Sequence, residues 1–468
     1  MATPTDSPQT GKVPWLSTRR ALIFSALTVA AFHLAYQYEA WGGLIFVYLI
    51  GMFGLAWVKS TRWAFYLGMA VGLAIGMPQL HFFYGIFNVA AVTLWPVFAL
   101  WFGFYLLLAR MVVERWPKYG ALWIPVLWLA LEYFRSELYY LRFAWLTPGF
   151  ALAHPTWLPY TRVGVYGVSF FTLLFLAWMW TLRGRRRARF VAMFAVAAVL
   201  VAMKLIPPTD AARGPLIVGI QFEGASTHDQ LAALDEALAA HPDADLFMLS
   251  EYSFDGPVPT SVRAWCRQHG KHLLAGGRED VDEHLAGGSQ YRNTAFVVSP
   301  EGEVVFRQAK SVPIQFFQDG LPAETQEVWK SPWGKIGIAI CYDLSYTRVM
   351  DPLVRGGARA LLIPTMDAQS WGEHEHVLHT KVAPVRAREY GLAILRVASS
   401  GISQLVDREG RVLATAPFPG PSVRIVGELP IARSGRLPID RYLALPAVIA
   451  VAGLLLYLLA RRVIELRQ

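Results

Sequence analysis

Charged residues are scarce in this sequence. They make up 16% of its 468 residues, while 54% of the residues are hydrophobic. This share of charge is low for a soluble protein. The sequence also has no internal repeat and no low-complexity segment. The shortage of charge argues against a wholly soluble chain and directs attention to the long hydrophobic runs.

These runs approach the ~20 residues that a helix needs to cross a bilayer. We expect eight membrane spans, and they are the segments 21–38, 41–58, 63–80, 90–110, 121–139, 162–182, 190–206 and 442–460. Residues between the last two segments are mixed polar and apolar, with glycine and proline turns. The sequence therefore predicts a membrane domain at 1–206, an extramembrane domain at 207–440, and a last span with a tail at 441–468.

Lysine and arginine are absent from the connection 81–89, although the formal net charge is +9. The basic residues follow alternate spans, as at 183–189, so they share one side if all eight segments cross. This asymmetry is typical of cytoplasmic loops, and it places the domain 207–440 on the other side, which in a bacterium is the periplasmic face of the inner membrane. Because topology accounts for the basic excess, we expect no nucleic-acid partner. The first segment lacks an A-x-A-like cleavage site and is interpreted as a retained span.

Three polar residues of the extramembrane domain each follow an apolar run: Glu251, Lys310 and Cys341. Open α/β sheets place their chemistry outside the carboxyl ends of strands. A thiol attacks as its thiolate, so Glu251 can act as general base. Lys310 and the backbone N–H of Tyr342 can stabilise an oxyanion. The predicted reaction is covalent acyl transfer through a thioester, and these residues leave open whether water or an amine receives the acyl group.

The other cysteine and the histidine cluster are weaker candidates for a reactive centre. Cys266 lies in an expected helix and is interpreted as a small packing residue. The spacing of His374, His376 and His379 matches no familiar zinc ligand set. We therefore expect no metal and no cofactor, and we expect His376 and His379 to orient a helix start or to line the site.

Strands, helices and hairpin signals alternate along the extramembrane domain. Pro300-Glu301-Gly302 separates two apolar runs, as the turn of a hairpin does. Helices are expected near 229–240 and 376–390. The mixture predicts an α/β domain whose sheet is mixed rather than purely parallel.

The order and surroundings of Glu251, Lys310 and Cys341 resemble the Glu-Lys-Cys triad of the nitrilase (carbon–nitrogen hydrolase) superfamily. The supporting motifs are Tyr-Arg-Asn-Thr at 291–294, Ile-Cys-Tyr-Asp at 340–343, Arg-Ala-Arg-Glu-Tyr-Gly at 386–391 and Val-Ala-Ser-Ser-Gly-Ile-Ser at 397–403. The resemblance implies an α-β-β-α sandwich for the extramembrane domain.

The membrane part is similar to that of the bacterial apolipoprotein N-acyltransferases, in which a nitrilase domain lies between a seventh and an eighth span. The similar stretches are 131–135, 143–146 and 164–168. This resemblance implies that a phospholipid acylates Cys341 and that the α-amine of a diacylglyceryl-cysteine at an apolipoprotein N-terminus then takes the acyl chain. Around the chains we expect Phe316, Phe317 and Trp371, and we expect the protein to be a monomer among membrane lipids.

One position departs from that family. A second glutamate is typical about eight residues after the lysine, and here Gln318 takes its place, with Asp319 beside it. An amide can form hydrogen bonds but cannot carry a proton at pH 7. We expect Gln318 or Asp319 to support Lys310, and we expect Asp319→Asn to harm turnover more than Gln318→Ala, because Gly320 would let the loop shift Asp319 into place. The departure keeps open a membrane-tethered amidase or another amine acyltransferase. A transporter is disfavoured, because ionisable residues within the spans are sparse and no pair of broken spans marks a central binding site.

Overall fold

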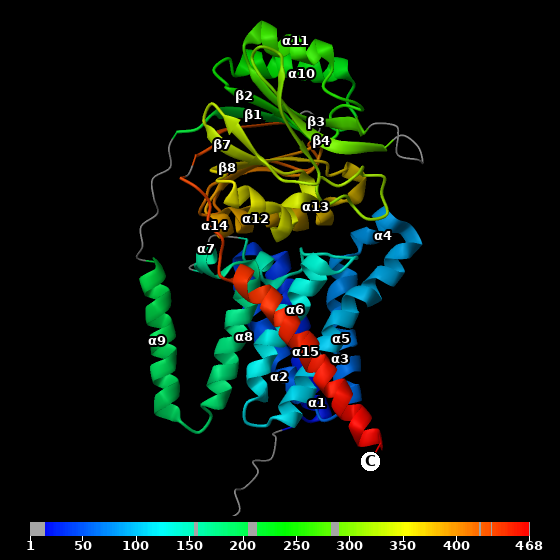
Figure 1. The fold of residues 1–468 in the computed structure, drawn as a ribbon, viewed down its shortest axis with the longest axis vertical. Coiled ribbons are helices and arrows are strands. Elements are labelled where there is room, and N and C mark those ends of the chain that lie inside the picture. Colours follow the sequence, from blue (N-terminus) through cyan, green and yellow to red (C-terminus); the bar gives the residue numbers. More distant parts are fainter. Residues whose placement is uncertain are drawn as a thin grey trace, which may run out of the picture.

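The computed structural model describes residues 15–153, 158–204, 213–281, 290–420, 423–431 and 433–467. Helices form one end of the molecule, and strands flanked by further helices form the other (Figure 1). The chain crosses between the two ends at α9 and β1 and returns at α15, so residues from both halves of the sequence meet where the two parts join.

The membrane part is built of helices, most of which coincide with the expected apolar segments, whereas the helix Phe82–Phe87 lies in the expected connection 81–89. Its helices are α1 (Thr18–Gln37), α2 (Ile45–Gly54), α3 (Thr61–Gln79), α4 (Phe82–Phe87), α5 (Ala91–Arg115), α6 (Trp123–Tyr133), α7 (Tyr160–Val163), α8 (Val165–Thr181), α9 (Arg186–Lys204) and α15 (Asp440–Arg467). Among the described residues, three helical stretches are long and apolar enough to cross a membrane, namely Glu39–Trp57, Phe82–Arg115 and Asp440–Glu465. Several apolar helices thus mark a membrane protein, and the count of eight spans stays a prediction.

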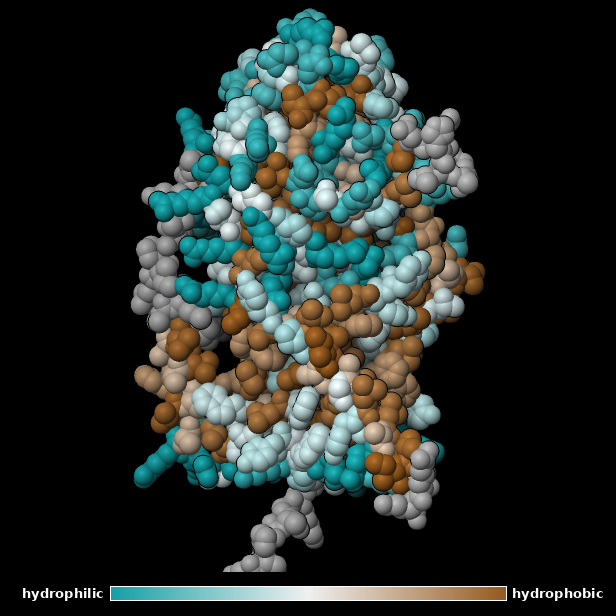
Figure 2. Space-filling model, viewed as in Figure 1, coloured by the Kyte–Doolittle hydropathy of each residue, from teal (hydrophilic) through white to brown (hydrophobic). Residues whose placement is uncertain are grey.

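The surface of the helical part carries a hydrophobic belt. Figure 2 shows hydrophobic residues around the middle of the helices on the face in view, between a hydrophilic strand part and a hydrophilic far end. The C-terminus and the turn between α8 and α9 lie at that far end (Figure 1). A belt between two polar zones is the surface that suits a bilayer.

Two six-stranded sheets form the other part, in the orders β12-β1-β2-β3-β4-β5 and β11-β10-β9-β8-β7-β6. The strands are β1 (Leu216–Ile220), β2 (Leu246–Leu249), β3 (His272–Val281), β4 (Gln290–Val298), β5 (Val304–Ala309), β6 (Val328–Ser331), β7 (Gly334–Ile338), β8 (Ala360–Thr365), β9 (Ala393–Ala398), β10 (Ser403–Val406), β11 (Val412–Ala416) and β12 (Arg424–Glu428). The central pairs β1–β2–β3 and β7–β8–β9 are parallel, and their neighbours are antiparallel. The prediction of mixed sheets is confirmed.

Helices cover both outer faces of the paired sheets. α10 (Thr227–Ala240) and α11 (Thr260–His269) lie over the first sheet, and α12 (Thr347–Arg355), α13 (Glu373–Thr380) and α14 (Val382–Tyr390) lie between the second sheet and the membrane helices (Figure 1). Alternate residues of one strand serve the two faces, because side chains alternate along a strand: Ile217 packs between the sheets and Val218 against the helices. The layers form the α-β-β-α sandwich that the resemblance implies.

Cys266 is fully buried on α11, packed among residues of the first sheet's outer face. Neither Cys266 nor Cys341 forms a disulfide. The interpretation of Cys266 as a packing residue is confirmed.

The prediction of a single helix over 376–390 is wrong, because the structure has two helices there, α13 and α14, which are separated at Lys381. Pro384 explains the break. A proline has no N–H, so the carbonyl of Thr380 loses the partner that an uninterrupted helix would supply four residues later.

A buried polar network joins the two parts. Asp440, the first residue of α15, accepts hydrogen bonds from the N–H groups of Tyr166 (3.0 Å) and Gly167 (3.4 Å) at the start of α8. Arg441 lies 2.8 Å from the Asp440 carboxylate and 3.0 Å from that of Glu389 on α14. Because Glu389 also accepts from the N–H of Val165 (2.7 Å), strand domain and helices are fixed to each other through charged hydrogen bonds.

Candidate active site

Glu251, Lys310 and Cys341 meet between the two sheets. Glu251 follows β2, Lys310 follows β5 directly, and Cys341 begins a 3-10 turn (Cys341–Ser345) shortly after β7. Lys310 Nζ lies 2.9 Å from Glu251 Oε1. The backbone of Met366 links the other pair, since its N–H donates to Glu251 Oε2 (2.7 Å) and its carbonyl accepts from the Cys341 thiol (3.6 Å). The structure therefore brings together the three residues predicted from strand ends.

Glu251 is held in place on both carboxylate oxygens. Asn293 Nδ2 donates to Oε1 over 2.6 Å, while the N–H of Met366 occupies Oε2. Burial raises the pKa of Glu251 above its usual value, against the attraction of the Lys310 ammonium. A carboxylate with a raised pKa is a stronger base than an exposed one, which suits it to remove a proton from a thiol.

Lys310 lies between two carboxylates. Its Nζ is 2.7 Å from Asp319 Oδ2, in addition to the contact with Glu251. Burial alone would lower the pKa of Lys310, but Glu251 and Asp319 outweigh burial and raise that pKa well above its usual value. Conversely, Lys310 overcomes the effect of burial on Asp319 and holds the pKa of that carboxyl below its usual value. The ammonium is therefore permanently charged and fixed in position.

Asp319 follows Gln318, the residue at the position that the resemblance gives to a second glutamate. Its carboxylate accepts from Tyr252 Oη (2.8 Å), Asn293 Nδ2 (3.0 Å) and the N–H of Ile314 (2.9 Å). The Gln318 side chain is exposed, and the carbonyl of Gln318 accepts from Tyr291 Oη. Of the two candidates for the support of Lys310, Asp319 is the one in contact with it.

Cys341 stands on a sharp turn. Its backbone φ of 53° lies in the left-handed region, which residues other than glycine seldom adopt. Asp343 stabilises the turn by accepting from the N–H groups of Ser311 (3.1 Å) and Val312 (2.7 Å). Burial, and then the Glu251 charge, raise the pKa of the Cys341 thiol well above its usual value. The resting sulfur is therefore a thiol, and it needs a base before it can attack.

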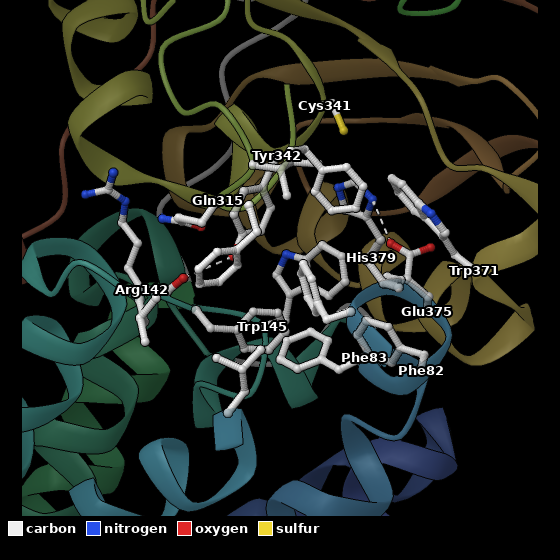
Figure 3. A pocket seen from close by; sticks show the side chains of 18 residues that line it. Phe82, Phe83, Arg142, Trp145, Gln315, Cys341, Tyr342, Trp371, Glu375 and His379 are labelled. Atoms are coloured by element: carbon white, nitrogen blue, oxygen red, sulfur yellow. Dashed lines mark hydrogen bonds and ion pairs between the residues drawn. The ribbon is translucent and has the colours of Figure 1, made fainter. Parts of the chain in front are cut away.

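A cavity of about 100 Å³ opens beside the thiol and has walls from both parts of the molecule (Figure 3). From the membrane side it is lined by Phe82, Phe83, Ile86, Phe87, Leu94, Leu141, Arg142, Phe143 and Trp145. From the strand side it is lined by Ile314, Gln315, Phe316, Phe317, Cys341, Tyr342, Trp371, Glu375 and His379. Phe316, Phe317 and Trp371, the residues expected around acyl chains, thus all line this cavity. Phe87 of α4 packs against both phenylalanines.

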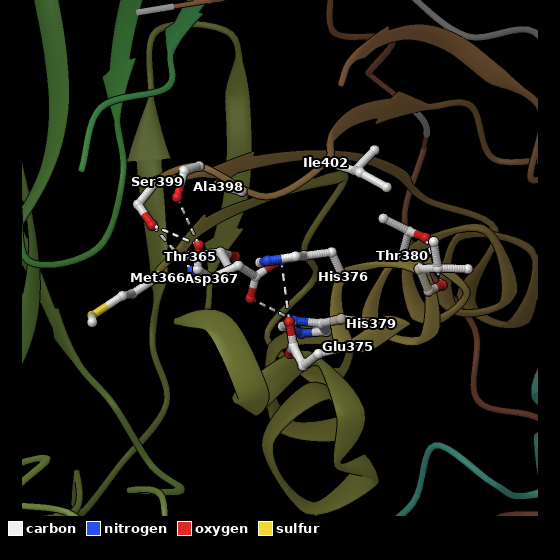
Figure 4. Close-up of polar contacts among 12 residues, drawn as sticks. Thr365, Met366, Asp367, Glu375, His376, His379, Thr380, Ala398, Ser399 and Ile402 are labelled. Carbon is white, nitrogen blue, oxygen red and sulfur yellow. Dashed lines mark hydrogen bonds and ion pairs between the residues drawn. The ribbon is translucent and has the colours of Figure 1, made fainter. Parts of the chain in front are cut away.

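His376 and His379 belong to a buried network next to the cavity (Figure 4), whereas His374 is half-buried and lies against Gln79 and His81. His379 Nδ1 lies 2.8 Å from Asp367 Oδ1, and the Asp367 carboxylate also forms an ion pair with Arg396. The His379 ring stacks on Trp145, with centroids 4.5 Å apart. Burial lowers the pKa of His379 to about 4, so the ring is neutral at pH 7 and lines the site as expected.

Carboxylate and imidazole groups of Asp367, Glu375 and His376 lie close enough together to hold a metal ion. Arg396, however, is paired with Asp367 inside this cluster. A guanidinium repels a metal cation, so the residues fit an internal ion-pair network better than a metal centre. Neither Asp367 nor Arg396 was predicted, because no local pattern marks them, whereas Asn293 and Asp343 lie within the motifs at 291–294 and 340–343.

Comparison with known proteins matches both parts of the chain. Residues 230–427 match the carbon-nitrogen hydrolase family, and residues 24–178 match the apolipoprotein N-acyltransferase N-terminal domain. A relative named apolipoprotein N-acyltransferase from Geobacter metallireducens is 24% identical, over 79% of this chain and 84% of its own length. One of the same name from Pasteurella multocida is 22% identical, over 82% of this chain and 85% of its own length.

Among solved structures, a carbon-nitrogen hydrolase from Helicobacter pylori is similar to 46% of this chain and 88% of its own, with 18% identity and a TM-score of 0.39. The two matched families follow each other along this sequence in the order in which the structure places membrane helices and sandwich. The chain is a membrane enzyme that belongs to the apolipoprotein N-acyltransferase family, within the carbon–nitrogen hydrolases.

Proposed function

We propose that the enzyme transfers an acyl chain from a phospholipid, through a thioester on Cys341, to the α-amine of the diacylglyceryl-cysteine that begins an apolipoprotein. The observation that carries the proposal is the cavity, because its walls combine a nucleophile with aromatic residues of membrane helices. A lipid donor stays in the bilayer, so a thiol next to membrane helices can reach it. The reaction takes place at the periplasmic face of the inner membrane, as the distribution of basic residues predicts.

In the first half-reaction Glu251 takes the proton of the Cys341 thiol, and the thiolate attacks the ester carbonyl of the phospholipid. The oxyanion that forms is stabilised by the Lys310 ammonium and the backbone N–H of Tyr342. When the intermediate collapses, the carbon–oxygen bond to the glycerol breaks and Glu251 returns its proton to the leaving oxygen. The products are a lysophospholipid and an acyl thioester on Cys341.

In the second half-reaction a neutral α-amine attacks the thioester carbonyl, and the same donors stabilise the second oxyanion. Glu251 removes a proton from the attacking nitrogen, and the carbon–sulfur bond breaks. The thiolate recovers that proton from Glu251, which restores the starting state. The permanently charged Lys310 serves both half-reactions without exchanging a proton.

An amidase on the same scaffold would use water in place of the amine. The departure at Gln318 kept that alternative open, and the ion pair of Asp319 with Lys310 weakens the reason for it, because a carboxylate beside the expected position contacts the lysine. The aromatic lining also supports an acyl chain as the occupant rather than a small amide.

The test is the formation of a covalent adduct by the purified protein. After incubation with phosphatidylethanolamine labelled in its acyl chains, the protein should carry label that neutral hydroxylamine removes, as it does from thioesters. Cys341→Ala should carry none, and Cys266→Ala, which removes another buried thiol, should retain it. Label on Cys341→Ala would refute the thioester, and label that never moves to a diacylglyceryl peptide would refute the transferase.

A further inference from the structure

Two arginines lie near the same aromatic ring beside the catalytic cavity. Arg142 comes from the segment after the π-helical turn Phe134–Leu138, and Arg348 comes from α12. Their guanidinium carbons lie 5.8 and 5.9 Å from the centroid of the same ring, that of Tyr346. Tyr346 packs edge-on against Tyr342, with centroids 4.9 Å apart. The pair is therefore one aromatic ring away from the residue that follows the nucleophile.

Arg142 itself lines the cavity. Figure 3 shows its guanidinium on the side opposite Glu375 and Trp371, directed away from the aromatic centre. The hydroxyl groups of Tyr342 and Tyr346 both donate to the Arg142 carbonyl, each over 3.4 Å, and so tie its backbone to the turn that carries Cys341. The cavity thus has an apolar interior and a cationic end at a fixed position relative to the thiol.

The positive charge at this end is not used up inside the protein. Arg142 Nε is buried and has no hydrogen-bond partner among the described residues. Two carboxylates, those of Glu137 and Asp343, lie near Arg348, but neither forms an ion pair with it among the described residues. Glu137 Oε1 accepts from Tyr166 Oη and the N–H of Thr347, Glu137 Oε2 is buried without a hydrogen-bond partner, and Asp343 accepts from the N–H of Val312. Burial, and then the neighbouring Arg142, lower the pKa of Arg348. Two guanidinium groups that repel each other are stabilised when an anion binds between them.

The chemistry of an anion that these arginines would bind follows from their neighbours. Guanidinium groups bind phosphate oxygens through paired hydrogen bonds. In a glycerophospholipid a short glycerol linker joins the ester carbonyl to the phosphodiester. Suppose that the carbonyl lies at the Cys341 sulfur and the acyl chain lies among the phenylalanines. The phosphodiester, which is negatively charged, then lies a short linker away from the thiol, within reach of the cationic end of the cavity.

We propose that Arg142 and Arg348 form a phosphate subsite that binds the headgroup phosphodiester of the acyl donor. The inference rests on the proposed function and adds to it a reason why the donor is a phospholipid rather than a neutral glyceride. The subsite acts in the first half-reaction only, because the phosphate leaves with the lysophospholipid.

The experiment compares two acyl donors, phosphatidylglycerol and the neutral ester p-nitrophenyl palmitate, with Arg142→Gln, Arg348→Gln and the double variant. Each single variant should lower kcat/KM for acylation by phosphatidylglycerol about 10-fold, and the double variant by more, since a hydrogen bond to a charged group is lost at each site. Acylation by p-nitrophenyl palmitate should not change, which also shows that the variants are folded. Arg424→Gln is the matched control, because Arg424 forms an ion pair with Glu236 in the first sheet's outer layer.

Equal losses with both donors, or no loss with phosphatidylglycerol, would overturn the subsite. Binding of phosphatidylglycerol to the Cys341→Ala protein is a second readout that needs no thioester, so it separates this inference from the proposed reaction. There the double variant should bind at least about 10-fold more weakly. sn-Glycerol 3-phosphate should compete poorly, and competition as strong as that of the lipid would assign the arginines to a soluble phosphate compound instead.

Discussion

Asp319 is the residue on which the charge of Lys310 depends most directly, after Glu251. We expect Asp319→Asn to slow acyl-enzyme formation about 10²-fold, because it weakens the positioning of an oxyanion donor. Gln318→Ala should stay within about 2-fold, as exposed substitutions do, and Gln318→Glu should be tolerated. The measurement is single-turnover acylation at matched amounts of protein. Inactivation by Gln318→Ala with a harmless Asp319→Asn would show that the amide supports the lysine.

Glu251 sets the acid limit of the reaction. Its pKa is raised by burial and by the Asp319 charge, so the rate of acylation should fall with decreasing pH at a pH above the ordinary value for glutamate, about 4.3. The sign follows from the role as base, since the protonated carboxyl cannot accept the thiol proton.

Asp319→Asn removes a negative charge that opposes ionisation of Glu251. The acid limb of the remaining activity should therefore move to lower pH in this variant. Rates measured from pH 4 to 8 would test this, with Gln318→Ala as the control whose limb should not move. An acid limb that moves to higher pH would mean that Lys310 has lost its contact with Glu251.

At this scale the sequence predicts the chemical groups better than their partners. Glu251, Lys310 and Cys341 were predicted because each follows an apolar run, which is a local pattern. The Asp367–Arg396 pair was not, because its members are far apart in the chain and are paired only by the packing of β8 and β9. Asp319 was expected to matter more than Gln318, but the sequence does not give the conformation of their loop, which buries the Asp319 side chain and leaves that of Gln318 exposed.

Among the secondary-structure elements, β3 passes unusually close to the segment that carries Glu251. A Cβ atom on Gly276 would lie 2.7 Å from Glu251 Cα and 2.7 Å from the N of Tyr252. Both are backbone atoms, so the chain itself would have to move. We expect Gly276→Ala to cost about 1–3 kcal/mol of stability through overpacking and to reduce acylation beyond that loss.

Gly256→Ala is the matched control, since a Cβ there meets no atom within 4 Å. Thermal unfolding and single-turnover acylation of both variants make the comparison. Full activity in Gly276→Ala would show that Glu251 tolerates a displacement of its backbone.

Some features of the secondary-structure elements could not be predicted from sequence patterns. The strands β2, β5 and β7 were predicted from the apolar runs before Glu251, Lys310 and Cys341, and their order in the sheets was not. β12 was missed, although it closes the first sheet by pairing antiparallel with β1, because its residues Arg424 to Glu428 contain few apolar side chains and are paired with a strand some two hundred positions away. The α13–α14 break was missed because the helical spacing continues across Pro384.

At the scale of the whole molecule, Arg441 connects the membrane part to the strand part. It begins α15 beside Asp440 and forms ion pairs with Asp351 of α12 and Glu389 of α14. Arg441→Gln leaves the buried carboxylates of Asp440 and Glu389 without their common partner. Breaking a buried ion pair from one side costs about 3–5 kcal/mol, so we expect a large decrease in the temperature of unfolding in detergent micelles. Arg461→Gln, which removes an exposed pair with Glu465 on the same helix, should cost less than about 1 kcal/mol. Equal stability of the two variants would show that the network does not hold the parts together.

The position of α15 has a consequence for the order of events during synthesis. The ribosome makes α6 and α8 early, and it makes α15, which packs against both, only after every strand of the two sheets. Until then the N–H groups of Tyr166 and Gly167 have no Asp440 carboxylate to accept their hydrogen bonds, and the flanks of α6 and α8 that α15 will cover face lipid. The helical part therefore lacks α15 for most of translation. It can reach its final packing only after all strands of the sandwich have been synthesised.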